Sequence, residues 1–120
     1  MNNFIPYGKQ FIDKQDINIV SKTLNSRLIT SGPKVEEFEN LFKKKFNSKF
    51  AISCSNGTSA LHLAYLSIGL KKDDVIIMPV VNFIASTNMA YVLRAKIYFA
   101  DIDPITSQMT PRDLENCIKK

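Results

Sequence analysis

The sequence predicts a domain of the α/β class that contains a parallel sheet. Two observations indicate this class: short apolar, β-rich runs alternate with stretches of helical periodicity, and turn residues separate them. Strands that alternate with helices in this way form βαβ units, whose strands lie parallel. The 120 residues, 45% of them hydrophobic and 22% charged, fit one globular domain with a core of its own.

Residues 1–48 are predicted to form an N-terminal arm followed by two amphipathic helices. Asp13 has the place of an N-cap, with Asp16 three residues later as its capping partner. The second helix is predicted to open at Gly32-Pro33, since proline suits the first helical position. Its acidic residues come early and Lys43 to Lys45 come late, which is the order that the helix dipole favours.

The pattern changes to strand, turn and helix at residue 50. Phe50 to Cys54 predicts a short strand, and Thr58 to Leu70 predicts a helix that is apolar on most sides and therefore buried. Gly69 lies where a C-terminal cap belongs. Val75 to Met78 predicts another strand, which Pro79 is expected to stop.

A second strand and helix unit follows. Ile84 to Leu93 is predicted as a helix and Lys96 to Ala100 as a strand, while Thr110-Pro111 is expected to start a last helix that continues to Lys120. The carboxylates of Asp101 and Asp103 follow the strand. A DxDP sequence at a strand exit is more typical of turn formation than of acid and base catalysis.

Charge and cysteine content exclude several function classes. The formal charge is +5, but thirteen of the sixteen basic residues are lysines, and arginine-led phosphate and base recognition is missing. We expect no nucleic-acid partner, although a basic polyanion-binding protein stays open as a third reading. Cys54 and Cys117 form neither a disulfide framework nor a metal site. No signal segment or apolar span is present, so we expect a cytoplasmic protein without a membrane partner.

The segment from Ser55 to Leu61 is the strongest candidate for chemistry. A strand is expected to end in a glycine turn at Gly57 that opens directly into a helix, with hydroxyls at Thr58 and Ser59. Free backbone N–H groups and the positive end of the dipole at a helix start suit a phosphate group. The alternative is a capped helix that binds nothing, and the residues alone leave both open.

Two aromatic residues are further candidates. Phe83 follows a strand at the carboxyl edge of the expected sheet, where ligands of α/β proteins bind, and could stack on a planar ring. Core packing is its commoner role and stays the alternative. Tyr7, in the N-terminal arm, either reaches a ligand or anchors the arm.

Taken together, these residues resemble the DegT/DnrJ/StrS family of pyridoxal-phosphate-dependent sugar aminotransferases, which have fold type I. The motifs that carry the resemblance, in the family's order and spacing, are IPYGKQ with Ile12-Asp13, LITSGP with VEEFE, SNGTSALHLA, the stretch Pro79 to Asn88 with FIASTN, and FADIDP with QMTP. The resemblance implies a three-layer large domain around a mainly parallel sheet. Residues 49–120 would be its incomplete, truncated start.

The resemblance also implies roles for individual residues. Gly57 and Thr58 would hold the phosphate of pyridoxal 5'-phosphate (PLP), with Ser59 nearby, and Phe83 would stack on its pyridine ring. The cofactor would be the electron sink of the reaction. These are the residues that the local chemistry also singles out.

The substrate side is implied in the same way. Tyr7 and Thr30 would line the sugar-nucleotide side of the site. The arm and the LxTxGP loop look most like the branch that aminates C4 of a UDP-linked 4-keto-6-deoxy-N-acetylhexosamine on the way to pseudaminic acid, with glutamate as the implied amino donor. Ser31 stands where that branch often has glutamine. The implied active form is a homodimer.

The family's Schiff-base lysine, its pyridine-binding aspartate and a further phosphate-binding serine lie later in the chain than residue 120. We therefore assign no catalytic residue here and expect the 120-residue chain alone to be inactive as a transaminase. Open strand edges are expected, and such edges favour aggregation. The alternative reading is a non-catalytic fragment that binds phosphate or cofactor, or a gene remnant.

Overall fold

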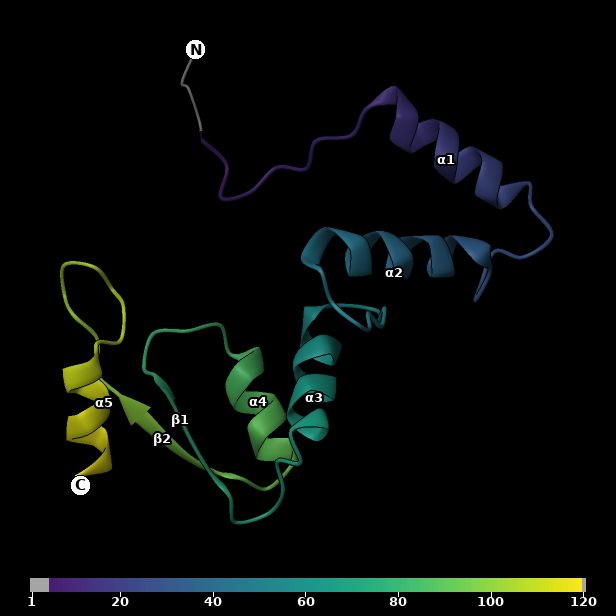
Figure 1. Ribbon diagram of the computed structural model, residues 1–120. Helices are drawn as coiled ribbons and strands as arrows, with labels where there is room; N and C mark the ends of the chain where they lie inside the picture. The colour runs from purple at the N-terminus through teal and green to yellow at the C-terminus, as the bar shows by residue number, and fades with distance from the viewer. Residues whose placement is uncertain (1–4, 120) are drawn as a thin grey trace. The chain divides into compact units, whose positions relative to one another are not determined.

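The computed structural model describes residues 5–119. The chain divides into two compact units, one ending at Ser53 and the other beginning at Cys54. Along the chain the structure gives the order α1 (Lys14–Leu24), α2 (Pro33–Phe46), α3 (Gly57–Ser67), β1 (Val75–Pro79), α4 (Ala85–Val92), β2 (Lys96–Ala100) and α5 (Pro111–Ile118) (Figure 1). The predicted α/β class is therefore confirmed.

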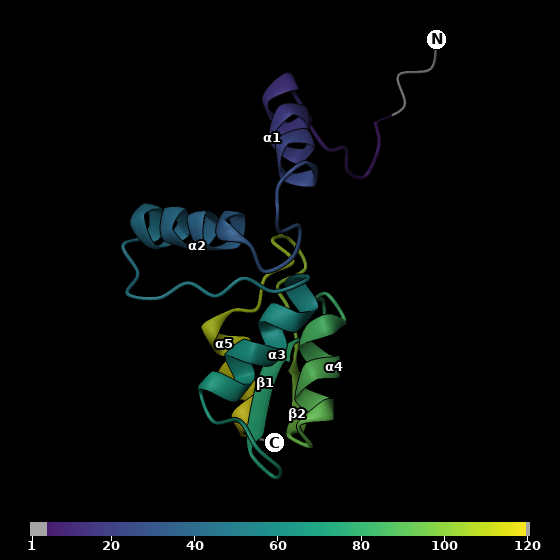
Figure 2. The ribbon, with the colours of Figure 1, turned by 90° about the vertical axis from the view of Figure 1, so that its right-hand side faces the viewer.

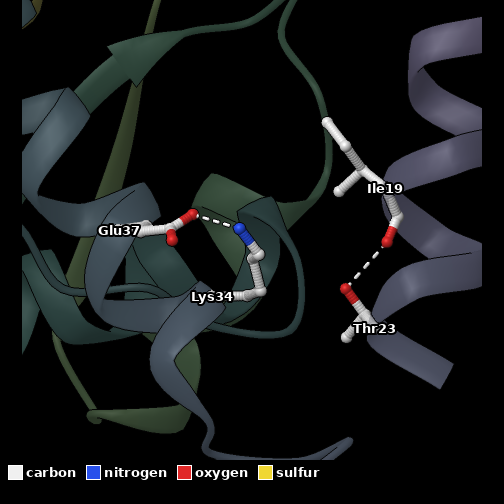
Figure 3. Close-up of polar contacts among 4 residues, drawn as sticks. All are labelled: Ile19, Thr23, Lys34 and Glu37. Atoms are coloured by element: carbon white, nitrogen blue, oxygen red, sulfur yellow. Dashed lines mark hydrogen bonds and ion pairs between the residues drawn. The ribbon is translucent and has the colours of Figure 1, made fainter. Parts of the chain in front are cut away.

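The first helix begins where the sequence predicts. The Asp13 carboxylate accepts the backbone N–H groups of Gln15 at 2.6 Å and Asp16 at 3.1 Å, and Asp16 accepts the N–H of Asp13 at 2.9 Å, which completes a capping box. Near the other end of α1, the Thr23 hydroxyl donates to the Ile19 carbonyl at 2.9 Å (Figure 3). Reciprocal capping satisfies two of the N–H groups that a helix start leaves without partners.

The second helix carries a row of aromatic rings along one side. It starts at Pro33, as predicted, and an exposed ion pair joins Lys34 and Glu37 in its first turns (Figure 3). An exposed pair of this kind adds little stability. The ring centroids of Phe38 and Phe42 lie 4.5 Å apart, and Phe46 continues the row.

The predicted strand over Phe50 to Cys54 is wrong. Within residues 5–119 this segment pairs with no strand, and the N–H of Ser53 donates instead to the Glu39 carboxylate at 2.8 Å. An apolar, β-rich sequence can favour extended backbone, but a strand exists only where a neighbouring strand supplies the ladder of hydrogen bonds.

The second unit contains a parallel pair of strands. Each residue of β1 has a partner in β2, from Val75 opposite Lys96 to Pro79 opposite Ala100. Strand β1 continues one residue further than predicted, with Pro79 at its last position. The ladder ends at the next residue, where the N–H of Val80 donates to the Ala100 carbonyl at 2.9 Å. With α4 between the strands, this is the predicted βαβ unit.

The helices of the second unit are shorter than predicted. After α3, Gly69 has φ +76°, its N–H donates to the Leu66 carbonyl, and the N–H of Leu70 donates to the Tyr65 carbonyl. These two bonds make a Schellman cap, which stops the helix at Ser67. The last helix ends at Ile118, and the part of the prediction that reaches Lys120 lies outside the described residues.

The predicted burial of α3 is also wrong, because the structure buries no residue of this helix. Among the described elements α3 packs mainly against α4, and Figure 2 shows the two helices side by side. Figure 1 shows α5 on the opposite side of the strand pair. The buried apolar residues are few and mostly small: Met78, Ala85, Ala90 and Ala100. No helix within residues 5–119 is long and apolar enough to cross a membrane.

Candidate cofactor site

The side chain of Asn56 caps the start of α3. This residue is extended, with φ −168° and ψ 171°, and its Oδ1 accepts the N–H of Ser59 at 2.9 Å. The cap places Gly57 and Thr58 at the first two helical positions. Backbone N–H groups at these positions have no partner within the helix, so they stay available as donors.

Two serines complete the polar cluster around this cap. The Nδ2 of Asn56 donates to Ser55 Oγ at 3.3 Å, and Ser55 Oγ and Ser59 Oγ share a hydrogen bond of 3.2 Å. The cluster therefore engages both the N–H and the hydroxyl of Ser59. The contributions of Ser55 and Asn56 were missed in the sequence, although the N-cap preference of asparagine before a helix was a signal for one of them.

The donors that stay available fit a phosphate group. Within the described chain the half-buried Thr58 hydroxyl makes no hydrogen bond, so it adds an O–H donor beside the two free N–H groups. A Cβ built on Gly57 meets nothing within 4 Å, which leaves open space in front of the backbone. Neutral donors at the positive end of a helix dipole are the chemistry that holds a phosphate.

Phe83 lies in the connection between β1 and α4. Its side chain is 76% exposed, so the described chain does not bury it. The amide of the preceding Asn82 donates back to the Pro79 carbonyl, which bends the chain away from the strand. Figure 1 shows this connection and the start of α3 at the same end of the second unit, where the strands finish. The structure thus brings the loop that carries Phe83 to the end that carries Gly57 and Thr58.

The two residues expected on the substrate side belong to the first unit. Tyr7 lies in the arm and Thr30 in the loop between α1 and α2, and both are exposed. Ser31, beside Thr30, has φ +49° and lines a hollow of about 580 Å³ at the start of α2, together with Leu28, Gly32, Pro33, Val35, Glu36, Glu39 and Ser53. Neither Tyr7 nor Thr30 is part of that lining.

Asp103 has a structural role, as its sequence context indicates. Its Oδ1 accepts the N–H of Thr106 at 2.7 Å, the Thr106 hydroxyl at 3.0 Å and the N–H of Ile105 at 2.9 Å. These bonds, led by the one from the Thr106 backbone, lower the pKa of the Asp103 carboxyl. The three bonds to Oδ1 fix the ionised carboxylate inside the turn, so Asp103 stabilises the exit from β2.

Glu39 holds the end of the first unit. Its Oε1 accepts both the N–H and the hydroxyl of Ser53 at 2.8 Å. Hydrogen bonds to the charged form, first that from the Ser53 backbone, lower the pKa of the Glu39 carboxyl below its ordinary value of 4.5.

This bond predicts an acid-dependent loosening of the first unit. A carboxyl whose pKa is lower in the folded state contributes stability above its unfolded pKa, and the contribution is lost as the pH falls through the folded pKa. We expect the protection factor of the Ser53 amide, its intrinsic exchange rate divided by the observed rate, to fall at acid pH, and Glu39→Gln to show this lower protection already at neutral pH. Amide exchange followed by NMR checks this. Equal protection of Ser53 in both proteins at neutral pH would contradict it.

Comparison with known proteins agrees with this fold. An uncharacterised protein of Methanocaldococcus jannaschii is 39% identical over 116 residues, which are 97% of this chain and 30% of that protein. An aminotransferase of Psychrobacter cryohalolentis matches at TM-score 0.81 and 28% identity, over 95% of this chain and 29% of that structure. A sugar aminotransferase described as putative, from Streptococcus pneumoniae in its PLP form, matches at TM-score 0.86 and 27% identity. This match covers 94% of this chain and 29% of that structure.

A relative that is named as a dehydratase, and not as an aminotransferase, has the same fold. The GDP-4-keto-6-deoxy-D-mannose-3-dehydratase of E. coli, solved with hydrated PLP, matches at TM-score 0.85 and 27% identity, over 92% of this chain and 30% of that structure.

The chain spans about 30% of the length of these relatives. The model of the DegT/DnrJ/EryC1/StrS aminotransferase family matches residues 10–120. This match covers most of the chain, which therefore belongs to the DegT/DnrJ/EryC1/StrS aminotransferase family.

Proposed function

We propose that this chain supplies one part of the PLP site of a sugar aminotransferase. The observation that carries the proposal is the set of free donors at the start of α3, which lies at the end of the unit where the strands finish (Figure 1). Family membership supports it, and so do the relatives of known structure that hold PLP or its amine form, PMP. The large domain would begin near residue 49.

Each residue has one task in this proposal. The N–H groups of Gly57 and Thr58 and the Thr58 hydroxyl hold the phosphate, with Ser59 beside them. Phe83, exposed at the same end of the unit, covers one face of the pyridine ring. The bound cofactor supplies the electron sink for amino transfer, while these residues fix where its phosphate and its ring lie.

The proposed substrate is a UDP-linked 4-keto-6-deoxy-N-acetylhexosamine, which receives an amino group from glutamate at C4. The arm with Tyr7 and the loop with Thr30 support this choice, because they resemble those of UDP-4-amino-4,6-dideoxy-N-acetyl-β-L-altrosamine transaminase, an enzyme of pseudaminic acid biosynthesis. We place this activity in the cytoplasm and in a homodimer of chains as long as the solved relatives. The 120 residues by themselves would be inactive.

Expression of the complete gene tests the proposal. We expect the purified protein to show the visible absorbance of bound PLP, to lose it on addition of glutamate, and to convert the UDP-keto sugar to a product with the mass of the amino sugar. Dehydration of a GDP-linked keto sugar instead would assign the reaction of the E. coli relative. Cofactor binding without turnover would favour the non-catalytic reading. If the protein binds neither PLP nor the sugar substrate but shows salt-dependent binding to DNA or RNA, the result would favour the polyanion-binding reading.

Phe83→Ala is expected to weaken cofactor retention by about 1 kcal/mol, the value typical of one aromatic stacking contact. The side chain is exposed, so the stability of the cofactor-free protein should not change. Equilibrium dialysis with PLP and thermal unfolding of the cofactor-free protein check the two parts. Tyr91→Ala, at an aromatic that is 77% exposed on α4, is the matched control. Unchanged retention in Phe83→Ala would contradict the stacking role.

A further inference from the structure

The connection from β1 to α4, residues 80–84, is not held in place by burial. Its four large apolar side chains are each more than half exposed in the described chain: Val80, Val81, Phe83 and Ile84. A side chain that removes little apolar surface from water contributes little to stability. The hydrogen bonds of the connection therefore decide where the described chain holds it.

Backbone hydrogen bonds fix both ends of the connection. The N–H of Val80 donates to the Ala100 carbonyl at 2.9 Å, and the N–H of Ser86 donates to the Phe83 carbonyl at 3.2 Å. Within residues 5–119 no side chain caps the start of α4. Between its two ends the connection contains a single polar side chain, that of Asn82.

Asn82 ties the middle of the connection back to the strand. The Pro79 carbonyl can only accept, so the group that meets it is the Nδ2 amide of Asn82. This bond joins the last residue of β1 to the residue directly before Phe83 and closes a turn over the two valines between them. Asparagine stabilises turns through side-chain bonds of this kind. The backbone that carries the exposed ring of Phe83 is therefore restrained before any ligand is present.

We propose that Asn82 is a positioning residue for Phe83: its bond to Pro79 holds the phenyl ring ready to cover one face of the pyridine ring of the cofactor. Stacked rings need a defined offset and tilt. A connection that is already restrained also loses less conformational freedom when the ligand binds. This inference rests on the proposed function, since it assigns a task to Asn82 within the proposed PLP site.

Asn82→Ala removes the bond but keeps the ring. We expect the Kd for PMP to rise about threefold, which is less than the loss of about fivefold expected for Phe83→Ala. PMP is the probe because it forms no Schiff base, so its Kd reports non-covalent contacts alone. The Kd for inorganic phosphate should not change, since Asn82 is proposed to act on the ring. Asn82 is exposed, so the cofactor-free variant should unfold at nearly the wild-type temperature.

A double variant tests whether Asn82 acts through Phe83. In the Phe83→Ala background, Asn82→Ala should have no further effect on the Kd for PMP, because the ring that it positions is gone. Asn82→Ser keeps a donor that can bond a nearby carbonyl more weakly, and it should restore most of the affinity. Asn116→Ala is the matched control, at an exposed asparagine of α5 on the opposite side of the strand pair (Figure 1), and should leave the Kd unchanged.

Equilibrium dialysis of the protein made from the complete gene gives outcomes that separate this inference from the proposed function. If the wild type does not bind PMP, the proposed cofactor site is wrong and the inference fails with it. If Phe83→Ala weakens PMP binding and Asn82→Ala does not, the site stands and the inference is overturned. An equal loss of PMP and inorganic phosphate in Asn82→Ala would overturn it too, because the residue would then be structural. So would a loss that persists in the Phe83→Ala background, because Asn82 would then act without the ring.

Discussion

Replacing Gly57 by alanine is expected to weaken PLP binding on the order of 100-fold, the loss that follows when one charge-assisted hydrogen bond is blocked. The fold itself does not need glycine here. The residue is the first of α3, its φ lies outside the left-handed region, and an added Cβ meets no atom within 4 Å. The same methyl group would take up part of the open space beside the N–H groups that the phosphate is proposed to approach.

Stability and affinity should therefore change in opposite directions. Alanine restricts the unfolded chain more than glycine, so the cofactor-free Gly57→Ala protein should gain about 0.5 kcal/mol in free energy of unfolding. Gly8→Ala is the matched control, because its Cβ also meets nothing within 4 Å and the residue belongs to the N-terminal arm. Denaturant unfolding and equilibrium dialysis measure the two quantities. A stabilised Gly57→Ala protein with unchanged PLP affinity would remove Gly57 from the phosphate site.

Features that depend on a few neighbouring residues were predictable from the sequence. The capping box of α1, the starts of α2 at Pro33 and of α5 after Thr110, and the cap at Gly69 each depend on residues within about one helical turn. The exact span of β2 was also predicted, because its apolar run is bounded on both sides. In each of these cases the preferences of local sequence and the final structure agree.

Features that depend on distant partners were not predictable. The apolar run Phe50 to Cys54 has the composition of a strand, but composition does not specify a neighbouring strand, and the N–H of Ser53 bonds to Glu39 fourteen residues earlier. The apolar helix α3 was expected to be buried for the same reason, yet the described chain covers it mainly with α4. Burial is a property of what packs on a segment, and the segment's own sequence carries only its capacity for burial.

The candidate site divides in the same way. The free N–H groups of Gly57 and Thr58 follow from a local turn and helix pattern, so these residues could be identified from the sequence, and their role in binding phosphate remains a prediction. The exposure of Phe83 could not be predicted from the sequence. A phenylalanine in an apolar stretch has the same local sequence pattern whether it packs in a core or faces a ligand. Tyr7 and Thr30 depend on how distant segments assemble, and their substrate role remains a prediction.

Met78→Ala is expected to lower the free energy of unfolding by about 2–4 kcal/mol, as for other methionine truncations in a core. Met78 is 5% exposed, and the other residues that form the buried core of the described chain are the alanines at positions 85, 90 and 100. These alanines bring α4 and β2 close together but have little side chain to fill the space that the truncation would leave. The Thr87 hydroxyl also loses its 3.1 Å hydrogen bond to the Met78 sulfur.

The position of Met78 gives the substitution a second effect. It precedes Pro79, the last residue of β1, so a cavity at Met78 loosens the strand end from which the connection to α4 departs. Cofactor retention should then fall together with stability, unlike in Phe83→Ala, where retention falls alone. Met89→Ala, the same truncation at a half-buried position on α4, is the control and should cost less than half as much. Denaturant unfolding with an unchanged m-value measures the difference, and equal losses at Met78 and Met89 would show that the core is not centred on β1.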